Sequence, residues 1–117
     1  MSTAKKLLSA GAPVGLAQAI NGTVQTLTLA GSASTDAAKI TGEIVLISAG
    51  TGGAILPASD AGDTFLIKNE SGNTATLYPP SGATINTTTS LSVPTAKSVQ
   101  VFFSSNTKCH TNPTVPT

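Results

Sequence analysis

The chain has one cysteine and one histidine, and they are adjacent at Cys109 and His110. Thiolate and imidazole are the ligands that zinc prefers, so the pair is the first candidate for chemistry. Adjacent residues on a strand point to opposite faces, which places the two side chains poorly for sharing a metal ion. A single cysteine also excludes an internal disulfide. We therefore interpret Cys109 and His110 as structural residues and predict no metal site on them.

Acidic residues offer a second candidate, because Asp60 and Asp63 are three residues apart and Glu43 or Glu70 could join them. Calcium takes six or more oxygen ligands, usually from a loop dense in Asp and Asn. No such loop is present in the sequence. These acids are predicted to be solvated turn residues, and no metal or other cofactor is expected.

The glycine-rich stretch 49–53 (AGTGG) contains the glycines of a phosphate-binding loop. It lacks the following Lys-Ser/Thr and the helical pattern that such a loop requires, so it is predicted to connect two strands. No spacing in the sequence supports a Ser-His-acid or Cys-His arrangement. The protein is therefore not expected to be an enzyme.

Charged residues make up 9% of the chain, compared with about 25% in ordinary soluble domains. Six lysines, no arginine and five acids give a net charge of +1. This balance gives no electrostatic basis for binding nucleic acid or an anionic membrane. Weakly charged surfaces lose little hydration when they pack against neighbours, so the composition suits a component of an assembly. Aromatic residues are only 3%, so extra burial between subunits would help a modest core.

Residues 1–20 are interpreted as an extended N-terminal arm. Lys5 and Lys6 precede an apolar stretch, as in a secretory signal, but polar and helix-breaking residues interrupt it at Ser9, Gly11, Pro13 and Gly15. No stretch approaches the roughly 18 apolar residues of a membrane-spanning helix. Pro13 could begin one short helix over 14–20, because proline is accepted in a first helical turn.

The arm carries five apolar residues without enough chain to form a core of its own. An extended apolar segment can lie along a partner surface and add contact area there. We expect these residues to contact a partner or another copy of the chain: Leu7, Leu8, Val14, Leu16 and Ile20.

Residues 21–112 are predicted to form one all-β domain, an antiparallel β-sandwich or barrel of jelly-roll-like type with little helix, followed by a tail at 113–117. Short β-branched or alternating runs are separated by Gly, Pro, Asn and Ser turn signals. The expected strands are 23–29, 43–48, 54–56, 63–69, 74–78, 83–86, 90–93 and 98–104, with 108–111 as a possible edge.

The stretch 63–78 allows finer predictions. Phe65 and Ile67 should share one face of their strand, while Thr64, Leu66 and Lys68 share the other. Residues 70–73 (ESGN) are predicted to close a tight hairpin into the next strand. Two prolines at 79–80 should end that strand, and Ser81-Gly82 should turn the chain into the following one.

An ordered set of segments resembles the small structural proteins of tailed bacteriophages, and most of all the head decoration, or cement, group. The segments are GDTFLIKN at 62–69, SGN at 71–73, TLYPPSGATIN at 76–86 and FFSS at 102–105, and the resemblance spans about 43–110. It implies a compact β-domain that forms homotrimers on the outer surface of the capsid. There it would clamp neighbouring subunits of the major capsid protein, without catalytic residues. The resemblance thus implies a virion protein made in the host cytoplasm.

Two other classes stay open. A phage tail or fibre component would share the Thr/Ser/Gly-rich β composition. A carbohydrate-binding module is the other class, although such sites usually present aromatic platforms. Only a few aromatic side chains are available for one: Phe65, Tyr78, Phe102 and Phe103.

Overall fold

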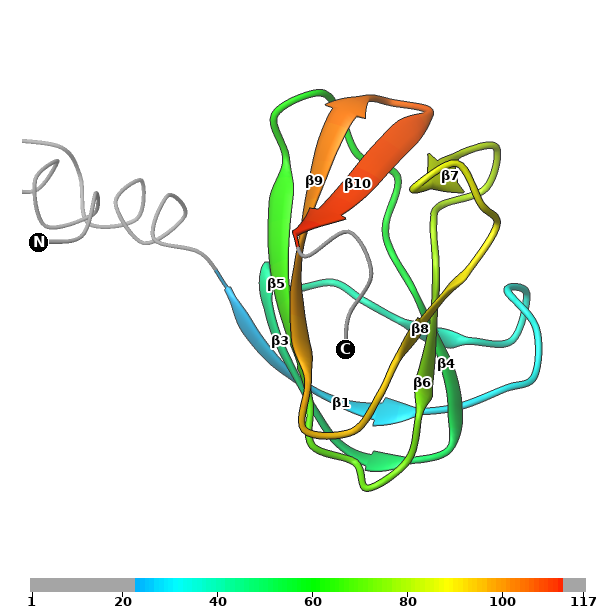
Figure 1. Ribbon diagram of the computed structural model, residues 1–117, viewed down its shortest axis with the longest axis vertical. Coiled ribbons are helices and arrows are strands. Elements are labelled where there is room, and N and C mark those ends of the chain that lie inside the picture. The colour runs from blue at the N-terminus through cyan, green and yellow to red at the C-terminus, as the bar shows by residue number, and fades with distance from the viewer. Residues whose placement is uncertain (1–22, 113–117) are drawn as a thin grey trace, which may run out of the picture.

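The computed structural model describes residues 23–112, which form ten strands and contain no helix (Figure 1). The strands are β1 (Val24–Leu29), β2 (Ala38–Lys39), β3 (Ile44–Gly50), β4 (Gly52–Ile55), β5 (Thr64–Asn69), β6 (Ala75–Tyr78), β7 (Thr84–Ile85), β8 (Leu91–Val93), β9 (Ser98–Ser105) and β10 (Lys108–Asn112). The all-β prediction is confirmed for the described range. No helix there is long and apolar enough to cross a membrane.

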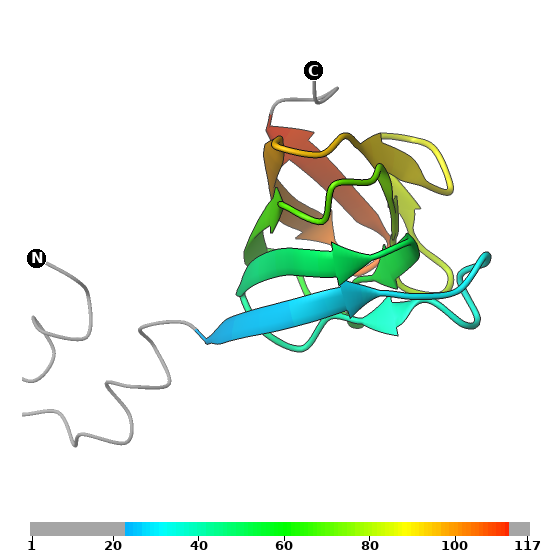
Figure 2. The same ribbon diagram turned by 90° about the horizontal axis from the view of Figure 1, so that it is seen from below.

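The first six strands alternate between two sheets, so the chain winds like a short β-solenoid. The six-stranded sheet has the order β1-β3-β5-β9-β10-β7, and the four-stranded sheet has the order β2-β4-β6-β8. Each turn of the winding adds one parallel strand to each sheet, which gives three rungs: β1 with β2, β3 with β4, and β5 with β6. Figure 2 shows β1 at the lower edge of this stack, with β3 directly above it.

The last strands close the winding differently. β8 pairs antiparallel with β6, and β9 pairs antiparallel with β5. β10 then adds antiparallel to β9, and the short β7 lies parallel to β10. The third rung is therefore covered in both sheets by strands from the C-terminal part of the domain.

The expected antiparallel, jelly-roll-like arrangement is wrong for most of the sheet pairing. Five of the eight strand pairs are parallel and three are antiparallel. The expected hairpin at 70–73 is also wrong, because β5 and β6 belong to different sheets. The turn residues there move the chain sideways into the facing sheet, so the strands from β1 to β6 pair with one another two places apart in sequence.

The buried amide of Asn69 holds the corner between β5 and β6, where the chain passes from one sheet to the other. Its Nδ2 donates to the carbonyl oxygens of Asn73 and Val93, both at 2.8 Å. Its Oδ1 accepts bonds from the backbone N–H of Ser71 at 3.0 Å and from the Ser71 hydroxyl at 2.7 Å. Four hydrogen bonds from one fully buried side chain hold the end of β5 to the corner and to β8.

Strand positions agree with the sequence predictions much better than pairing does. Nine predicted strands are present within one or two residues of their expected bounds, and only the two-residue β2 has no counterpart among them. The predicted turn after Pro79 and Pro80 is confirmed: β6 ends at Tyr78, and the Ala83 N–H donates to the Pro80 carbonyl at 2.9 Å.

The core lies between the two sheets and follows the alternation of the strands. In β5, Phe65 and Ile67 are buried while Thr64 and Leu66 are exposed, as predicted. Phe65 meets Phe103 edge to face, with ring centroids 6.0 Å apart. Aliphatic side chains supply most of the remaining core, including Val45, Ile47, Leu77, Val99 and Val101.

Candidate interaction surface

Four large apolar side chains are exposed on the outward face of the six-stranded sheet. Val24 is 71% exposed, Leu66 48%, Ile44 41% and Phe102 39%. They come from four adjacent strands: β1, β3, β5 and β9. We call these four residues the apolar row.

Strand register brings the row together. Val24 is the direct partner of Ile44, and Ile44 is the direct partner of Leu66. Phe102 pairs with Thr64, two residues before Leu66 on β5, so it lies diagonal to Leu66. Direct cross-strand partners have Cβ atoms about 4.5–5.5 Å apart, and diagonal partners remain within reach of an aromatic ring. The row is therefore a continuous patch.

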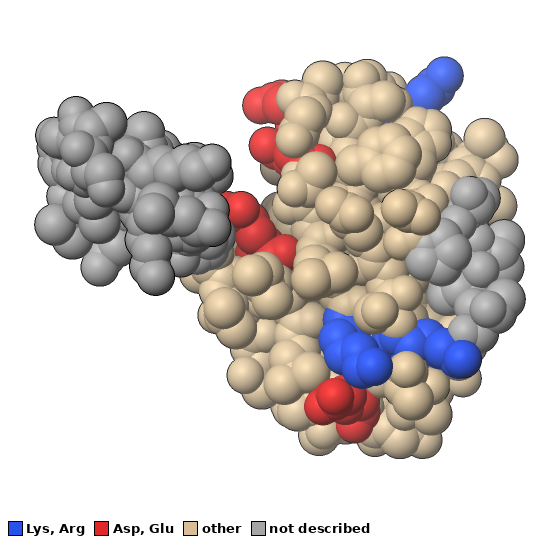
Figure 3. Space-filling view, turned by 60° about the vertical axis from the view of Figure 1, so that its left-hand side comes forward, with Lys and Arg blue, Asp and Glu red and all other residues tan. Residues whose placement is uncertain are grey.

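The surroundings of the row are polar but almost uncharged. The other outward positions of β1, β3, β5 and β9 are Thr, Ser and Gln, together with Ala49, the half-buried Leu46 and one charged residue, Lys68. The Lys68 ammonium donates to the Ala96 carbonyl at 3.1 Å, which draws it toward the 94–97 turn. Figure 3 shows a surface dominated by uncharged atoms, with the Lys and Asp/Glu side chains in small separate groups. A partner could cover this face at a low desolvation cost.

His110 extends the face beyond Phe102. The two rings lie 5.3 Å apart at an angle of 33°, and His110 Nε2 lies 2.9 Å from the Ser104 Oγ. A Ser–His pair at this distance is also the geometry of a nucleophile and its base. Within residues 23–112, however, no carboxylate hydrogen-bonds His110 to orient it. The pair is best described as a polar contact across β9 and β10.

Cys109 points to the opposite face, as the sequence predicted. It is 1% exposed, and its Sγ lies 3.3 Å from the Thr84 carbonyl oxygen. Burial raises the pKa of the Cys109 thiol to about 11, because desolvation disfavours the thiolate. A neutral buried thiol is neither a nucleophile nor a metal ligand at neutral pH.

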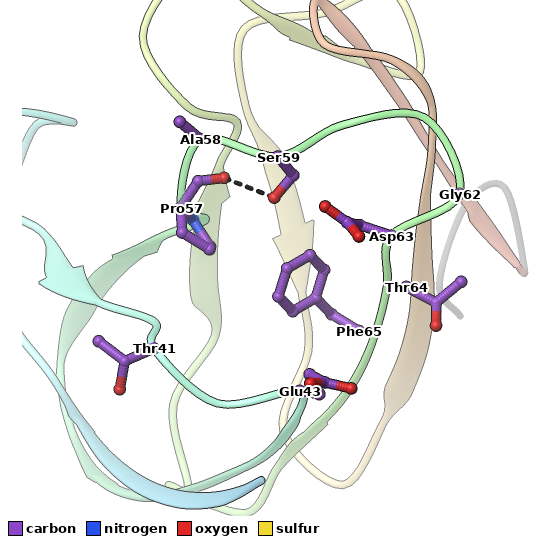
Figure 4. Close-up of a pocket in the computed structure, with 9 residues that line it drawn as sticks. All are labelled: Thr41, Glu43, Pro57, Ala58, Ser59, Gly62, Asp63, Thr64 and Phe65. Carbon is purple, nitrogen blue, oxygen red and sulfur yellow. Dashed lines mark hydrogen bonds between the residues drawn. The ribbon is translucent and has the colours of Figure 1, made fainter. Parts of the chain in front are cut away.

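A groove of about 360 Å³ lies beside the start of β5 and contains two acids, Glu43 and Asp63 (Figure 4). The polar groups in it already serve the local structure. Asp63 Oδ2 accepts a hydrogen bond from the Asp60 N–H at 2.9 Å, and the Ser59 hydroxyl donates to the Pro57 carbonyl at 2.9 Å. Asp63 thus has the turn role expected from the sequence.

The residues that line the groove include only two side chains of the types that bind metal ions, Glu43 and Asp63. In the described part of the chain, no three His, Cys, Asp or Glu side chains are grouped so that they could hold a metal ion. Every buried side-chain nitrogen and oxygen in the described range has a hydrogen-bond partner. The apolar row is therefore the stronger candidate for function.

The five arm residues named from the sequence, Leu7, Leu8, Val14, Leu16 and Ile20, lie outside the described residues, as does the 113–117 tail. The row itself was missed by sequence reasoning, although the alternation of β5 already placed Leu66 on the face opposite Phe65. What could not be seen was which residues of β1, β3 and β9 stand beside Leu66, because the parallel register supplies that information. Comparison with protein-family models finds no match, and comparison with curated proteins finds none either.

Proposed function

We propose that the protein is a non-enzymatic structural component of a tailed-bacteriophage head. It binds the outer surface of the capsid as a homotrimer and stabilises the shell by clamping neighbouring subunits of the major capsid protein. The observation that carries this proposal is the apolar row on a nearly uncharged sheet face. The sequence resemblance to phage decoration proteins supplies the identity of the partner.

The row has the character of a contact surface. Exposed apolar groups that form a continuous patch commonly mark sites of protein association. Val24, Ile44 and Leu66 follow one another across three parallel strands, so they present a flat strip that another protein surface can cover. The strip is fixed by the backbone ladder, and little conformational entropy is lost when it is covered.

The arm at 1–20 is proposed as the second contact. Of its five apolar residues, Leu7 and Leu8 stand farthest from β1 in the sequence, and they would extend the contact beyond the domain toward the shell or a neighbouring copy. A contact with two separate parts gains effective concentration, because binding of the first part holds the second near its site.

The test is binding of the purified protein to capsids that lack it, measured by co-sedimentation and by particle reconstruction. We expect saturable binding with trimeric density at threefold positions on the head. Density on the tail would overturn the decoration role and favour a tail component. Failure to bind heads, together with selective binding on a glycan array, would favour the carbohydrate-binding class.

A pair of variants tests the row itself. Ile44→Thr with Leu66→Thr places β-branched residues, which suit strands, at both positions while it removes the exposed apolar surface. We expect at least a tenfold loss of capsid affinity, about 1.4 kcal/mol or more. Surface substitutions of this kind should change the free energy of unfolding by only about 0.5 kcal/mol each.

The matched control is Thr26→Ser with Thr28→Ser, which alters the same face on β1 without removing a large apolar side chain. It should bind like the unmodified protein. If the Ile44/Leu66 variant also bound capsids normally while folded, the row would not be the contact surface.

A further inference from the structure

The outer edge of β1 is an open strand edge within residues 23–112. β1 stands first in the six-stranded sheet and pairs only with β3. Its sequence, VQTLTL, has six residues, no charge and no proline. Charges, prolines, very short length and β-bulges are the usual devices that protect an edge from further pairing. The edge of β1 lacks the first three, and the one irregularity of its pairing places the extra residue, Ser48, on β3. The edge can therefore accept another strand.

Backbone geometry identifies which residues face the open edge. The Thr23 carbonyl accepts bonds from the N–H groups of Glu43 and Ile44, both at 2.9 Å, so Thr23 faces β3. Residues along a strand direct their N–H and C=O groups alternately to its two edges. Gln25 and Leu27 consequently face β3, while Val24, Thr26 and Thr28 present their backbone groups to the open edge.

The core is also less closed at this edge. Leu27 is 7% exposed, whereas Ile47, its partner on β3, is 1% exposed. Gln25 occupies the inward row that holds Val45 on the second rung and Ile67 on the third. Its amide is used on the corner at 39–42: Oε1 accepts from Thr41 and Gly42, and Nε2 donates to Lys39. Solenoid windings need a capping element over such a terminal rung.

The residues just before β1 have the pattern of that missing strand. Over 14–20 the sequence VGLAQAI places Val14, Leu16, Gln18 and Ile20 on alternate positions, with only Gly and Ala between them. Strict alternation of large and small residues indicates a strand. Asn21-Gly22, a strong turn signal, separates this segment from β1.

We propose that residues 14–20 fold back across 20–23 and pair antiparallel with the open edge of β1 in the same chain. Val24 is the first residue facing that edge, so the register places Ala19 opposite Val24, Ala17 opposite Thr26 and Gly15 opposite Thr28. Leu16 then lies over Leu27 and Val14 over Leu29, on the core face. Pro13 ends the strand, because it has no N–H to donate.

The register explains the composition of the segment. Apolar Leu16 and Val14 meet the two apolar core residues of β1, and the Gln18 amide meets Gln25. On the outward face Ala19, Ala17 and Gly15 are small, so they leave Val24 and the apolar row uncovered. The strand replaces the short helix expected over 14–20, and it leaves Leu7 and Leu8 as the arm residues free to contact a shell. The proposal does not depend on capsid binding.

Amide hydrogen exchange on the full-length protein tests the pairing without any substitution. Gln25 and Leu27 face β3 and should be protected in every case, which makes them internal controls. Val24 and Thr26 face the open edge, so we expect them to be protected only if a strand covers them, by at least about tenfold over the rate of a free amide. Fast exchange at Val24 and Thr26 would overturn the proposal.

Disulfide trapping distinguishes pairing within one chain from pairing between copies. Ala17→Cys with Thr26→Cys joins directly opposed residues whose Cα atoms are about 5.5 Å apart, which a disulfide can span. Gln18→Cys with Thr26→Cys is the control, because its side chains lie on opposite faces. Native Cys109 can remain, since it is 1% exposed.

We expect the first pair to oxidise to a disulfide within the monomer and the control pair to keep its thiols. A disulfide between two chains, equal oxidation of both pairs, or no oxidation of the first pair would each overturn the proposal. A proline pair adds a second check. Ala17→Pro removes an N–H that faces β1 and should cut the protection of Thr26 about tenfold, whereas Gln18→Pro removes an N–H that faces away and should preserve it.

Discussion

The two ends of the winding are finished in different ways. At the third rung, β9 covers β5 and β8 covers β6, so both strands have neighbours on each side. At the first rung, β1 and β2 stand at the outer ends of their sheets in the described range. Parallel rungs alone therefore do not make a closed domain. The protein uses antiparallel strands from later in the sequence to close one end, and we propose that it uses residues before β1 to close the other.

The largest expected effect comes from core truncation at the two ends. Ile67 is 0% exposed and lies between Val45 and Val99, so Ile67→Ala should lower the free energy of unfolding by about 2–5 kcal/mol. Leu27 has a described strand partner on one side only, Ile47. If residues 14–20 cover it, Leu27→Ala in the full-length protein should lose a similar amount, within about 1 kcal/mol.

Chemical denaturation measures both losses, and a shortened chain sharpens the comparison. In a protein that begins at residue 21, Leu27→Ala should cost at least about 1 kcal/mol less than Ile67→Ala, because Leu27 is then packed on one side. The quantity to compare is the difference between the losses caused by Ile67→Ala and by Leu27→Ala. If that difference were the same in the full-length and shortened proteins, residues 1–20 would not cover the first rung.

A smaller effect should separate the two corner amides. Asn69→Ala removes four hydrogen bonds from a fully buried site and leaves the Val93 carbonyl without that donor, so we expect a loss of about 2–4 kcal/mol. Gln25→Ala also removes three bonds, but at a partly exposed corner that water can reach. Its loss should be about 1 kcal/mol.

Thermal and urea unfolding of the two variants test this difference. Equal losses would show that the corner of the first rung is as well enclosed as the corner between β5 and β6. A larger loss for Gln25→Ala would reverse the comparison of the two ends.

The last effect is absent at neutral pH: it is the alkaline pH dependence due to Cys109, which lies on β10 in the covered end. Burial raises its pKa from the ordinary 9.0 to about 11, so the folded protein keeps a proton that the unfolded chain loses. This contribution is fully present below pH 9 and is lost as the pH rises toward 11, by about 1.4 kcal/mol per pH unit.

The measurement is urea unfolding from pH 8 to pH 11 for the unmodified protein and for Cys109→Ala. The two proteins differ only at residue 109, so the difference between their slopes isolates the thiol. Parallel slopes above pH 9 would show that the thiol is not desolvated in the folded state.

Sequence reasoning located the strands because a strand and its turns are marked by alternation and turn residues within a few neighbouring positions. The residues of β5 show this well, since Phe65 and Ile67 are buried and Leu66 is exposed as predicted. It failed on pairing, because Ser71, Gly72 and Asn73 are typical of a hairpin and equally suit a corner between sheets. The contacts of the Asn69 side chain with Ser71, Asn73 and Val93 select the corner, and they depend on residues up to 24 positions apart.

The candidate surface was out of reach for the same reason. Val24, Ile44 and Leu66 are separated by about 20 residues each in the sequence and become neighbours only through the parallel register. β2 was missed because Ala38–Lys39 is too short to show any alternation. The predicted arm contacts remain predictions, since they lie outside the described residues.

The pairing of β5 with β9 has a consequence for synthesis on the ribosome. The two strands begin 34 residues apart, at Thr64 and Ser98, and they pair antiparallel from Thr64↔Phe102 to Lys68↔Ser98. As the nascent chain emerges, the first three rungs can stack on one another, but the far side of β5 stays bare until β9 has left the exit tunnel. A ribosome that stalls before that point would hold an intermediate whose β5 edge has unpaired backbone N–H and C=O groups. Chaperones or neighbouring nascent chains could bind that edge.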